Sequence, residues 1–379
     1  MKATIWRPSE LDGAVLECWR RLQRETPTLH HPFLTPEFAS AVGQASKNAR
    51  VAVVEDAGET VGFLAYDRHA LGVAKPIGGR LNYRQGFVHA DGLRWSWADL
   101  MHAVGIHGIE FTDLLASQAP AGDDLVLNPS PIIDTSIGWD AYLEQVRRHH
   151  NIKKTLKRAR RLEREHGPIS FTWGPVRNEE FAQMVAWKSE QYRSSGWPDP
   201  FARPWIRGAL DALIERNDGD LKVISTTLRA GEDLLAVDMS LISQDVLAAW
   251  FSSYNREFAD YSPGGIRRLR VIERACNEHL AYVDLARGDE PYKESFKNAE
   301  LHVATGLHRD RSPSALLYRS VHAPYKATRS WVLRNPSVRA FVRTTLRRFG
   351  SLRVNLRPHG LPEHPTSADI DAGARPASR

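Results

Sequence analysis

WFSSYNREFADYSPGGIRRLRVIERACNEHLAYVDLARGDEPYK, residues Trp250 to Lys293, decides how this chain is interpreted. The segment opens with apolar and aromatic residues, which predict a strand that ends near Tyr254. A Ser-Pro-Gly-Gly sequence follows at 262–265, and two adjacent glycines permit positive φ angles and the close approach of another group. The pattern after it predicts a helix, a short strand and a Gly-Asp-x-x-Tyr-Lys loop that ends at Lys293.

The start of the predicted helix is a candidate anion site. Its first-turn N–H groups and its dipole favour negative charge, and Arg267 and Arg268 stand beside them in the sequence. A pyrophosphate is the obvious candidate ligand. The alternative is an ordinary helix that begins at Ser262-Pro263, since such starts are common.

The length and composition of the chain limit the classes of protein to which it can belong. With 379 residues, 42% hydrophobic and 25% charged, it resembles a soluble globular protein of two domains, and both enzymes and binding modules fit. The start has no apolar core of a signal peptide, and no run of about 18 apolar residues occurs, so we expect a cytoplasmic protein. Cys18 and Cys276 are too far apart in sequence to suggest a disulfide framework or a zinc ribbon.

The net charge of +6 is concentrated in two segments, Arg147 to Arg164 and Arg309 to Arg357. Such segments can meet phosphates, anionic lipid or nucleic acid, but a charge run is as often a solvated face. The second segment contains a predicted basic amphipathic helix that starts at Asn335-Pro336, and the composition from Pro358 predicts a disordered tail.

Apolar periodicity predicts the remaining elements. We expect a helix over residues 9–25 with Ser9 as N-cap, a hairpin of 50–55 with 60–66, a single long helix over 140–166, and a meander of strands at 221–228, 234–242 and 246–254. A strand, an Ala-Gly-Glu turn and a second strand occur in both halves of the chain. This repeat suggests two copies of one α/β unit.

A meander that leads into a glycine loop, a helix and a further strand is the order of acyl-coenzyme A transferases of the GNAT fold. The chain resembles the BioF2-like (CelD-type) acetyltransferase domain, which is related to the Fem-type peptidoglycan aminoacyl transferases. The residues that carry the resemblance are Ala249 to Tyr254, Tyr261 to Gly264, Asp284-Leu285, Gly288 to Lys293 and Phe296. In place of the usual Gln/Arg-x-x-Gly-x-Gly/Ala loop, however, this chain has Ser262-Pro263-Gly264-Gly265.

The resemblance implies an α/β fold of the α+β type, built from two tandem GNAT-like domains with mixed, mostly antiparallel sheets flanked by helices. The expected divisions are an N-terminal domain without a clear cofactor loop (1–135), a C-terminal domain with one (136–308), the basic helical extension (309–357) and the tail (358–379).

The resemblance also implies acyl transfer from acyl-CoA or acetyl-CoA, or from a related thioester or aminoacyl donor, to an amine or hydroxyl. The acceptor would be a small molecule, a sugar, a polysaccharide or a cell-envelope precursor. In the Fem-type enzymes a lysine after an aromatic is thought to lie at the transferring carbonyl, and Lys293 fits that place. Cofactor binding is assigned to Tyr254, Ser262, Gly264, Gly265, Arg267 and Arg268.

Asp238 is the first candidate for a base, because a carboxylate inside an apolar strand has a raised pKa if it is buried. Asp284 and Asp289 compete for that role, and all three could instead cap a turn or pair with a cation. The candidates for substrate binding are Trp187, Trp250, Asp284, Asp289 and Tyr292, although aromatics at such positions are more often part of a core. The fifteen histidines lack metal-ligand spacing, so we expect no metal.

Two other functions stay open. The chain could be a catalytically degenerate GNAT-like module that binds partners in a polysaccharide synthesis or export system, with its basic extension at the anionic inner face of the membrane. It could also bind nucleic acid through 147–164, but that segment has no known reading motif, so nucleic acid is expected only as tRNA that carries the donor.

Overall fold

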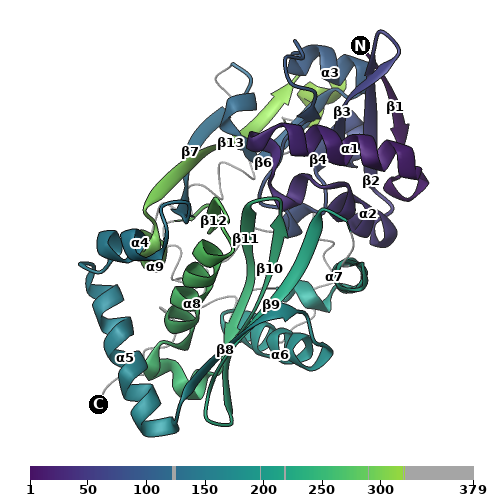
Figure 1. Ribbon diagram of the computed structural model, residues 1–379. Coiled ribbons are helices and arrows are strands. Elements are labelled where there is room, and N and C mark those ends of the chain that lie inside the picture. Colours follow the sequence, from purple (N-terminus) through teal and green to yellow (C-terminus); the bar gives the residue numbers. More distant parts are fainter. Residues whose placement is uncertain (122–124, 197, 217–218, 289, 319, 321–379) are drawn as a thin grey trace.

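The protein is described by a computed structural model that covers residues 1–121, 125–196, 198–216, 219–288, 290–318 and 320. In this part of the chain the strands form one sheet in the order β1-β2-β3-β4-β6-β13-β7-β12-β11-β10-β9-β8, and β5 pairs with β3 (Figure 1). Only β4/β6 and β11/β12 are parallel among these strand pairs. The predicted α/β fold with a mixed, mostly antiparallel sheet flanked by helices is therefore confirmed.

The strands are β1 (Lys2–Trp6), β2 (Ala49–Asp56), β3 (Glu59–Arg68), β4 (Val73–Pro76), β5 (Val88–His89), β6 (Gly108–Leu115), β7 (Leu125–Asp134), β8 (Ile169–Pro175), β9 (Leu221–Ala230), β10 (Asp233–Ser243), β11 (Val246–Tyr254), β12 (Tyr282–Asp284) and β13 (Ala299–Arg309). The α-helices are α1 (Gly13–Glu25), α2 (Pro36–Ala45), α3 (Trp97–Val104), α4 (Trp139–Val146), α5 (His150–His166), α6 (Asn178–Ser194), α7 (Pro204–Glu215), α8 (Pro263–Asn277) and α9 (Pro291–Phe296). The predicted hairpin and meander correspond to β2/β3 and β9/β10/β11.

The strand order is the same when it is followed inward from either edge of the sheet. Four strands of one half (β1 to β4, or β8 to β11) are followed by one parallel strand (β6 or β12), and then by a strand that belongs to the other half in sequence. β13 thus pairs with β6, and β7 pairs with β12. This arrangement is what duplication of one unit would produce, with the last strand exchanged between copies; the division at residues 135 and 136 stays a prediction.

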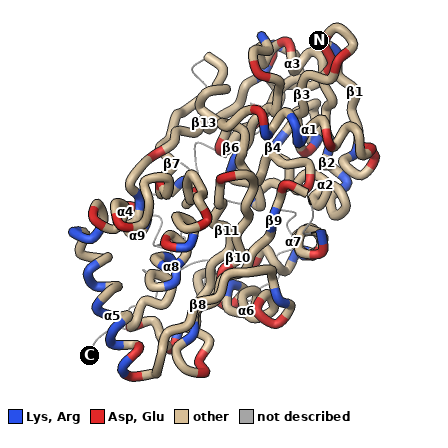
Figure 2. Tube along the Cα trace, viewed as in Figure 1, with Lys and Arg blue, Asp and Glu red and all other residues tan. Residues whose placement is uncertain are grey.

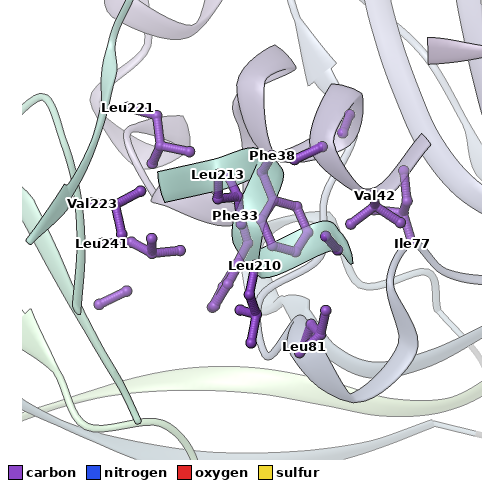
Figure 3. Packing of buried hydrophobic residues seen from close by; sticks show 14 of the residues in the cluster. Phe33, Phe38, Val42, Ile77, Leu81, Leu210, Leu213, Leu221, Val223 and Leu241 are labelled. Carbon is purple, nitrogen blue, oxygen red and sulfur yellow. The ribbon is translucent and has the colours of Figure 1, made fainter. Parts of the chain in front are cut away.

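The main core joins the two halves. Figure 3 shows Phe33, Phe38 and Val42 from the first half beside Leu210, Leu213 and other apolar residues of the second half. Phe38 and Val42 lie on α2, Leu210 and Leu213 lie on α7, and each of the four is almost completely buried. Since burying a side chain of this size contributes roughly 1.5–3 kcal/mol, the two halves are stabilised as one unit.

Two predicted helix boundaries are wrong. The first helix begins at Gly13, because the Asp12 carboxylate accepts the Val15 N–H at 2.8 Å and so caps it in place of Ser9. The predicted helix over 140–166 is two helices, α4 and α5. His149 has an extended backbone (φ −63°, ψ 133°), so the chain changes direction between α4 and α5. Helix α5 then buries Ile152 and Leu162 against other residues of the second half.

Residues 310–318 follow β13 and pack against the first half. Ala315 and Tyr318 are buried there, and Tyr318 donates its hydroxyl to Glu110 at 2.7 Å. The helix predicted after Asn335 and the tail predicted from Pro358 lie outside the described residues. Within the described part, none of the helices is long and apolar enough to span a bilayer.

Candidate functional site

The segment from β11 to α8 has the predicted order of strand, loop and helix. β11 ends at Tyr254, a short 3-10 helix η8 (Arg256–Tyr261) follows, and Ser262 takes a left-handed conformation (φ 56°, ψ 54°) before α8 begins. A Cβ added to Gly265 would lie 3.2 Å from Thr155 Oγ1, so this glycine permits close contact between α8 and α5. A Cβ on Gly264 would lie 4.0 Å from the Tyr254 ring, which places that ring beside the glycine loop.

Helix α5 adds positive charge at this loop. The Arg158 guanidinium donates a hydrogen bond to the Ser262 hydroxyl, although the two residues are far apart in sequence. Arg161 lies over the Tyr261 ring, 4.5 Å from its centroid. The two features that the sequence presented separately, the basic segment and the glycine loop, therefore form one surface.

An open groove of about 650 Å³ lies along this surface. Figure 2 shows Lys and Arg residues along much of α5, at one edge of the molecule. The groove is lined by Lys154, Lys157, Arg158, Arg160, Arg161, Arg164 and Asp260. Arg161 and Arg164 also pair with Glu165, so six cations face two carboxylates, and this excess of positive charge favours a ligand carrying several negative charges. The start of α8 near Ser262 adds a favourable helix dipole, although Pro263 has no N–H and the N–H groups of Gly265 and Ile266 donate to the Ser262 carbonyl.

Arg267 does not contribute to this groove, contrary to its predicted role in phosphate binding. Its side chain is 3% exposed, and it lies against the sheet with Nη1 2.9 Å from Asp238 Oδ2. It also donates to Thr226 and Ser252, and Ser240 donates to Asp238 at 2.6 Å. Burial lowers the pKa of the Arg267 guanidinium, and Asp238 opposes that shift. Asp238, the predicted base, is thus held in a buried ion pair.

Arg268 points in another direction and covers α9. Its guanidinium carbon is 3.9 Å from the centroid of the Tyr292 ring and 5.2 Å from that of Phe296. Such stacking is a cation–π contact, which contributes on the order of 1 kcal/mol. The predicted cofactor residue Arg268 and the predicted substrate residue Tyr292 therefore lie together, next to the first turns of α8.

Lys293 lies on a helix, where a loop was predicted, because Pro291 begins α9. Its side chain is 3% exposed. The ammonium lies 3.0 Å from the Ala286 carbonyl oxygen, 3.1 Å from that of Arg287 and 3.0 Å from Glu290 Oε2. Only the two carbonyl contacts are hydrogen bonds, since Glu290 Oε2 lies at ion-pair distance without accepting a hydrogen bond from the described residues. In this geometry Lys293 holds the segment that follows β12.

Asp284 was predicted to bind substrate, but its side chain is fully buried. It pairs with Arg84, and His31 Nε2 lies 3.2 Å from its Oδ2. His31 Nδ1 accepts the Phe33 N–H at 3.3 Å, so the ring proton is assigned to Nε2, facing Asp284. Burial lowers the pKa of His31 to about 4. Burial alone would raise the pKa of Asp284, but Arg84 and His31 hold it well below its usual range.

Trp250 is likewise part of the contact between the halves. Its indole N–H donates to the Leu81 carbonyl at 2.9 Å, and its ring packs against Phe33 and Phe38. Trp187 is half-buried on α6 and packs against the main core. Asp289 lies outside the described residues. The predicted aromatic substrate pocket is therefore replaced by core packing for both tryptophans.

Sequence reasoning missed the first-half residues that reach the second half, namely His31, Tyr83 and Arg84. His31 belongs to a His-Pro-Phe-Leu-Thr-Pro sequence that predicts a break before a helix and that also fits the resemblance to the BioF2-like group, but neither signal indicates a contact with Asp284. Nothing near Tyr83 or Arg84 distinguishes them as sequence. In the described part of the chain, no group of three or more His, Cys, Asp or Glu side chains is placed to hold a metal ion.

Comparisons with known proteins concern the fold described above. A family model described as an acetyltransferase (GNAT) domain matches residues 150–294, a segment that begins with α5 and ends in α9. No curated protein sequence matches the chain.

Several solved structures have a similar fold. The structure of FemX is 11% identical in sequence with a TM-score of 0.58, over 85% of this chain and 100% of that one. A conserved protein of unknown function from Bacteroides thetaiotaomicron is 10% identical with a TM-score of 0.51, over 80% of this chain and 99% of that one. The C-terminal domain of a putative lysylphosphatidylglycerol synthetase from Agrobacterium fabrum is 9% identical with a TM-score of 0.50, over 82% and 96%. At such low identity these similarities concern the fold alone.

Proposed function

We propose, from the match of residues 150–294 to an acetyltransferase (GNAT) domain model, that this chain transfers an acyl group from acyl-coenzyme A to an amine or hydroxyl. The observation that carries the choice of donor is the basic groove along α5, whose Arg158 also donates a hydrogen bond to Ser262 just before α8. Coenzyme A carries a pyrophosphate and a further phosphate, and a groove with six cations and a helix start suits such a ligand.

In this proposal the groove holds the phosphates and leaves the acyl end of the donor to reach β11 and β12. The acceptor nitrogen or oxygen attacks the thioester carbonyl carbon, the C–S bond breaks, and the sulfur leaves as the thiolate. The proton that the acceptor loses can then neutralise that thiolate. Holding the two reactants in place supplies much of the rate enhancement of such a transfer.

We assign Lys293 a positioning role, because it donates hydrogen bonds to the Ala286 and Arg287 carbonyls and pairs with Glu290. It acts on the reaction by fixing the segment after β12, since its side chain is buried and bonded to that segment. Lys293→Met should therefore lower both the melting temperature and the rate of transfer, while Lys293→Arg, which keeps the charge, should retain more of each.

For the acceptor we propose a sugar, polysaccharide or cell-envelope precursor, in a cytoplasmic protein that contacts the inner face of the membrane at its periphery. The support is the resemblance of the 249–296 segment to the BioF2-like and Fem-type groups. A degenerate module that binds coenzyme A without turnover is the second candidate, and the buried pairing of Asp238, Asp284 and Lys293 favours it.

The test is binding of acetyl-CoA by isothermal titration calorimetry, with thermal unfolding as a second readout. A ligand at 100 times its Kd stabilises the folded state by about 2.7 kcal/mol, so acetyl-CoA should raise Tm. The variant Lys154→Glu/Lys157→Glu should bind at least about tenfold more weakly, because each lost hydrogen bond to a charged group is worth roughly 1.5–3 kcal/mol.

Lys222→Glu is the control, since Lys222 is an exposed cation of β9 outside the groove. Its Kd for acetyl-CoA should equal that of the unmodified chain. Absence of acetyl-CoA binding by the unmodified chain would refute the proposed donor, and a rise in Tm with an oligonucleotide instead would favour nucleic-acid binding.

A further inference from the structure

The strands β11 and β12 separate at one point in the sheet. They pair in parallel as far as Ala248 and Asp284 and no further. On its other side β11 is irregular at the same level, since Met239 of β10 lies opposite Phe251 while Ser240 lies opposite Ala249. Trp250 is therefore the extra residue of a β-bulge, which bends its strand.

Residues 81–84 of the first half make contact at this point of separation. The Tyr83 hydroxyl donates to the Ala249 carbonyl at 2.9 Å and lies 3.4 Å from the Asp284 carbonyl oxygen. Leu81 accepts the Trp250 indole N–H, and Arg84 pairs with the Asp284 carboxylate. One short segment thus bonds to the last paired residue of β12 and to the next two residues of β11.

We propose that residues 81–84 act as a wedge that fixes the separation of β11 and β12, with the Tyr83 hydroxyl as the positioning group. Ala249 is the first residue of β11 beyond the parallel ladder and is half-buried, and a carbonyl shielded from water needs a hydrogen-bond donor. The Tyr83 hydroxyl donates to this carbonyl from a position between the two strands. The contacts of Leu81 with Trp250 and of Arg84 with Asp284 keep the Tyr83 ring in place.

This step rests on the proposed function: the direction of β11 at Ala249 determines where the donor binds. β11 continues from Ala249 to Tyr254, and η8 then leads directly to Ser262 and the glycine loop. The wedge therefore sets where the basic groove lies relative to β12. It also gives the first half, which was predicted to lack a cofactor loop, a part in the second half's site.

The first half provides a matched comparison at its own parallel pair. β4 and β6 pair through Ala74 and Ile109, and the next residues are Lys75 and Glu110. Here the buried Tyr318 donates its hydroxyl to Glu110 at 2.7 Å, and Lys75 Nζ is 5.7 Å from the Tyr318 ring centroid. A buried tyrosine thus contacts each of these strand pairs, but only Tyr83 bonds to the strand that leads to the basic groove.

Tyr83→Phe and Tyr318→Phe test the proposal, because each removes one buried hydroxyl and keeps the ring. Both variants of the full chain should lose a few degrees of Tm. In hydrogen exchange measured by mass spectrometry, Tyr83→Phe should increase amide exchange of peptides that cover 249–254 at least about fivefold. Its Kd for acetyl-CoA should rise at least about tenfold, whereas Tyr318→Phe should change neither quantity more than about twofold.

Unchanged exchange over 249–254 in Tyr83→Phe, or an equal increase in Tyr318→Phe, overturns the wedge. An unchanged Kd in Tyr83→Phe overturns its positioning role. If the unmodified chain binds no acetyl-CoA, the proposed donor fails while the exchange comparison still decides the wedge. Should Tyr83→Phe fail to fold, Trp250→Phe removes the bond to Leu81 and should give the same increase in exchange; no increase would overturn the wedge.

Discussion

The buried pair of Asp238 and Arg267 gives a sharp prediction about stability. Asp238→Asn keeps the shape of the side chain but removes the charge that faces the guanidinium. At the 2.9 Å between Nη1 and Oδ2, Coulomb's law with an effective dielectric constant of about 20 gives an attraction of about 6 kcal/mol. Removing one partner of a buried pair typically costs about 3–5 kcal/mol, because the remaining charge stays desolvated, so we expect a loss in that range.

The assay is equilibrium unfolding in urea, with unfolding free energies extrapolated to water. Arg267→Met should lose a similar amount, since it leaves the Asp238 carboxylate buried at 3% exposure. The double variant Asp238→Leu/Arg267→Met removes both charges and should recover most of the loss. It should also bind acetyl-CoA with the affinity of the unmodified chain, because neither side chain lines the groove.

Two results would refute this reasoning. Losses below about 1 kcal/mol in both single variants would mean that the pair is solvated or absent. A loss in the double variant equal to the sum of the losses in Asp238→Leu and Arg267→Met, each measured alone, would mean that the two residues do not interact. A double variant that is stable, binds acetyl-CoA and is inactive in transfer would return Asp238 to its predicted role as a base.

Further predictions concern pH and packing. Burial raises the pKa of Asp67 to about 7, above its unfolded value, so the stability it contributes is lost as pH rises from about 4 through 7; Asp67→Asn should be more stable at pH 8 by roughly 2–4 kcal/mol and unchanged at pH 4, and the exposed Asp140→Asn should show no such gain. The pKa of His31 is lowered to about 4, below its unfolded value of about 6.5, so unfolding free energy should fall as pH drops through that window, and the fall should be smaller in His31→Asn; an equal fall would contradict burial of a neutral ring. Gly265→Val should destabilise the chain by about 1–3 kcal/mol more than Gly264→Val, because only the former meets Thr155 at 3.2 Å; equal losses in urea unfolding would contradict the close contact of α5 and α8.

Local sequence patterns predicted much of the fold, because they report on neighbours along the chain. Alternation and a short polar turn predicted the β2/β3 hairpin, and the glycine loop predicted where α8 begins. The break at His149 was not predictable, since an extended residue inside a helical pattern depends on how α5 packs against the second half. The exchange of β7 and β13 between halves depends on pairing across the whole chain.

Sequence patterns likewise predicted one part of the candidate site and not the other. Ser262, Gly264 and Gly265 were found because their sequence is unusual, and they do lie at the start of α8. The face of β10 to which Asp238 points could not be read from its sequence, and that face decides that it meets Arg267. The contact of Arg158 with Ser262 joins residues 104 positions apart, so the groove could not be predicted from either segment alone.

A crystal structure of the chain with coenzyme A tests the central claim most directly. We predict that its phosphate oxygens lie within about 3 Å of groove-lining cations such as Lys157 and Arg158. Phosphates bound elsewhere on the chain, with the groove between α5 and η8 left free of ligand, would contradict the account.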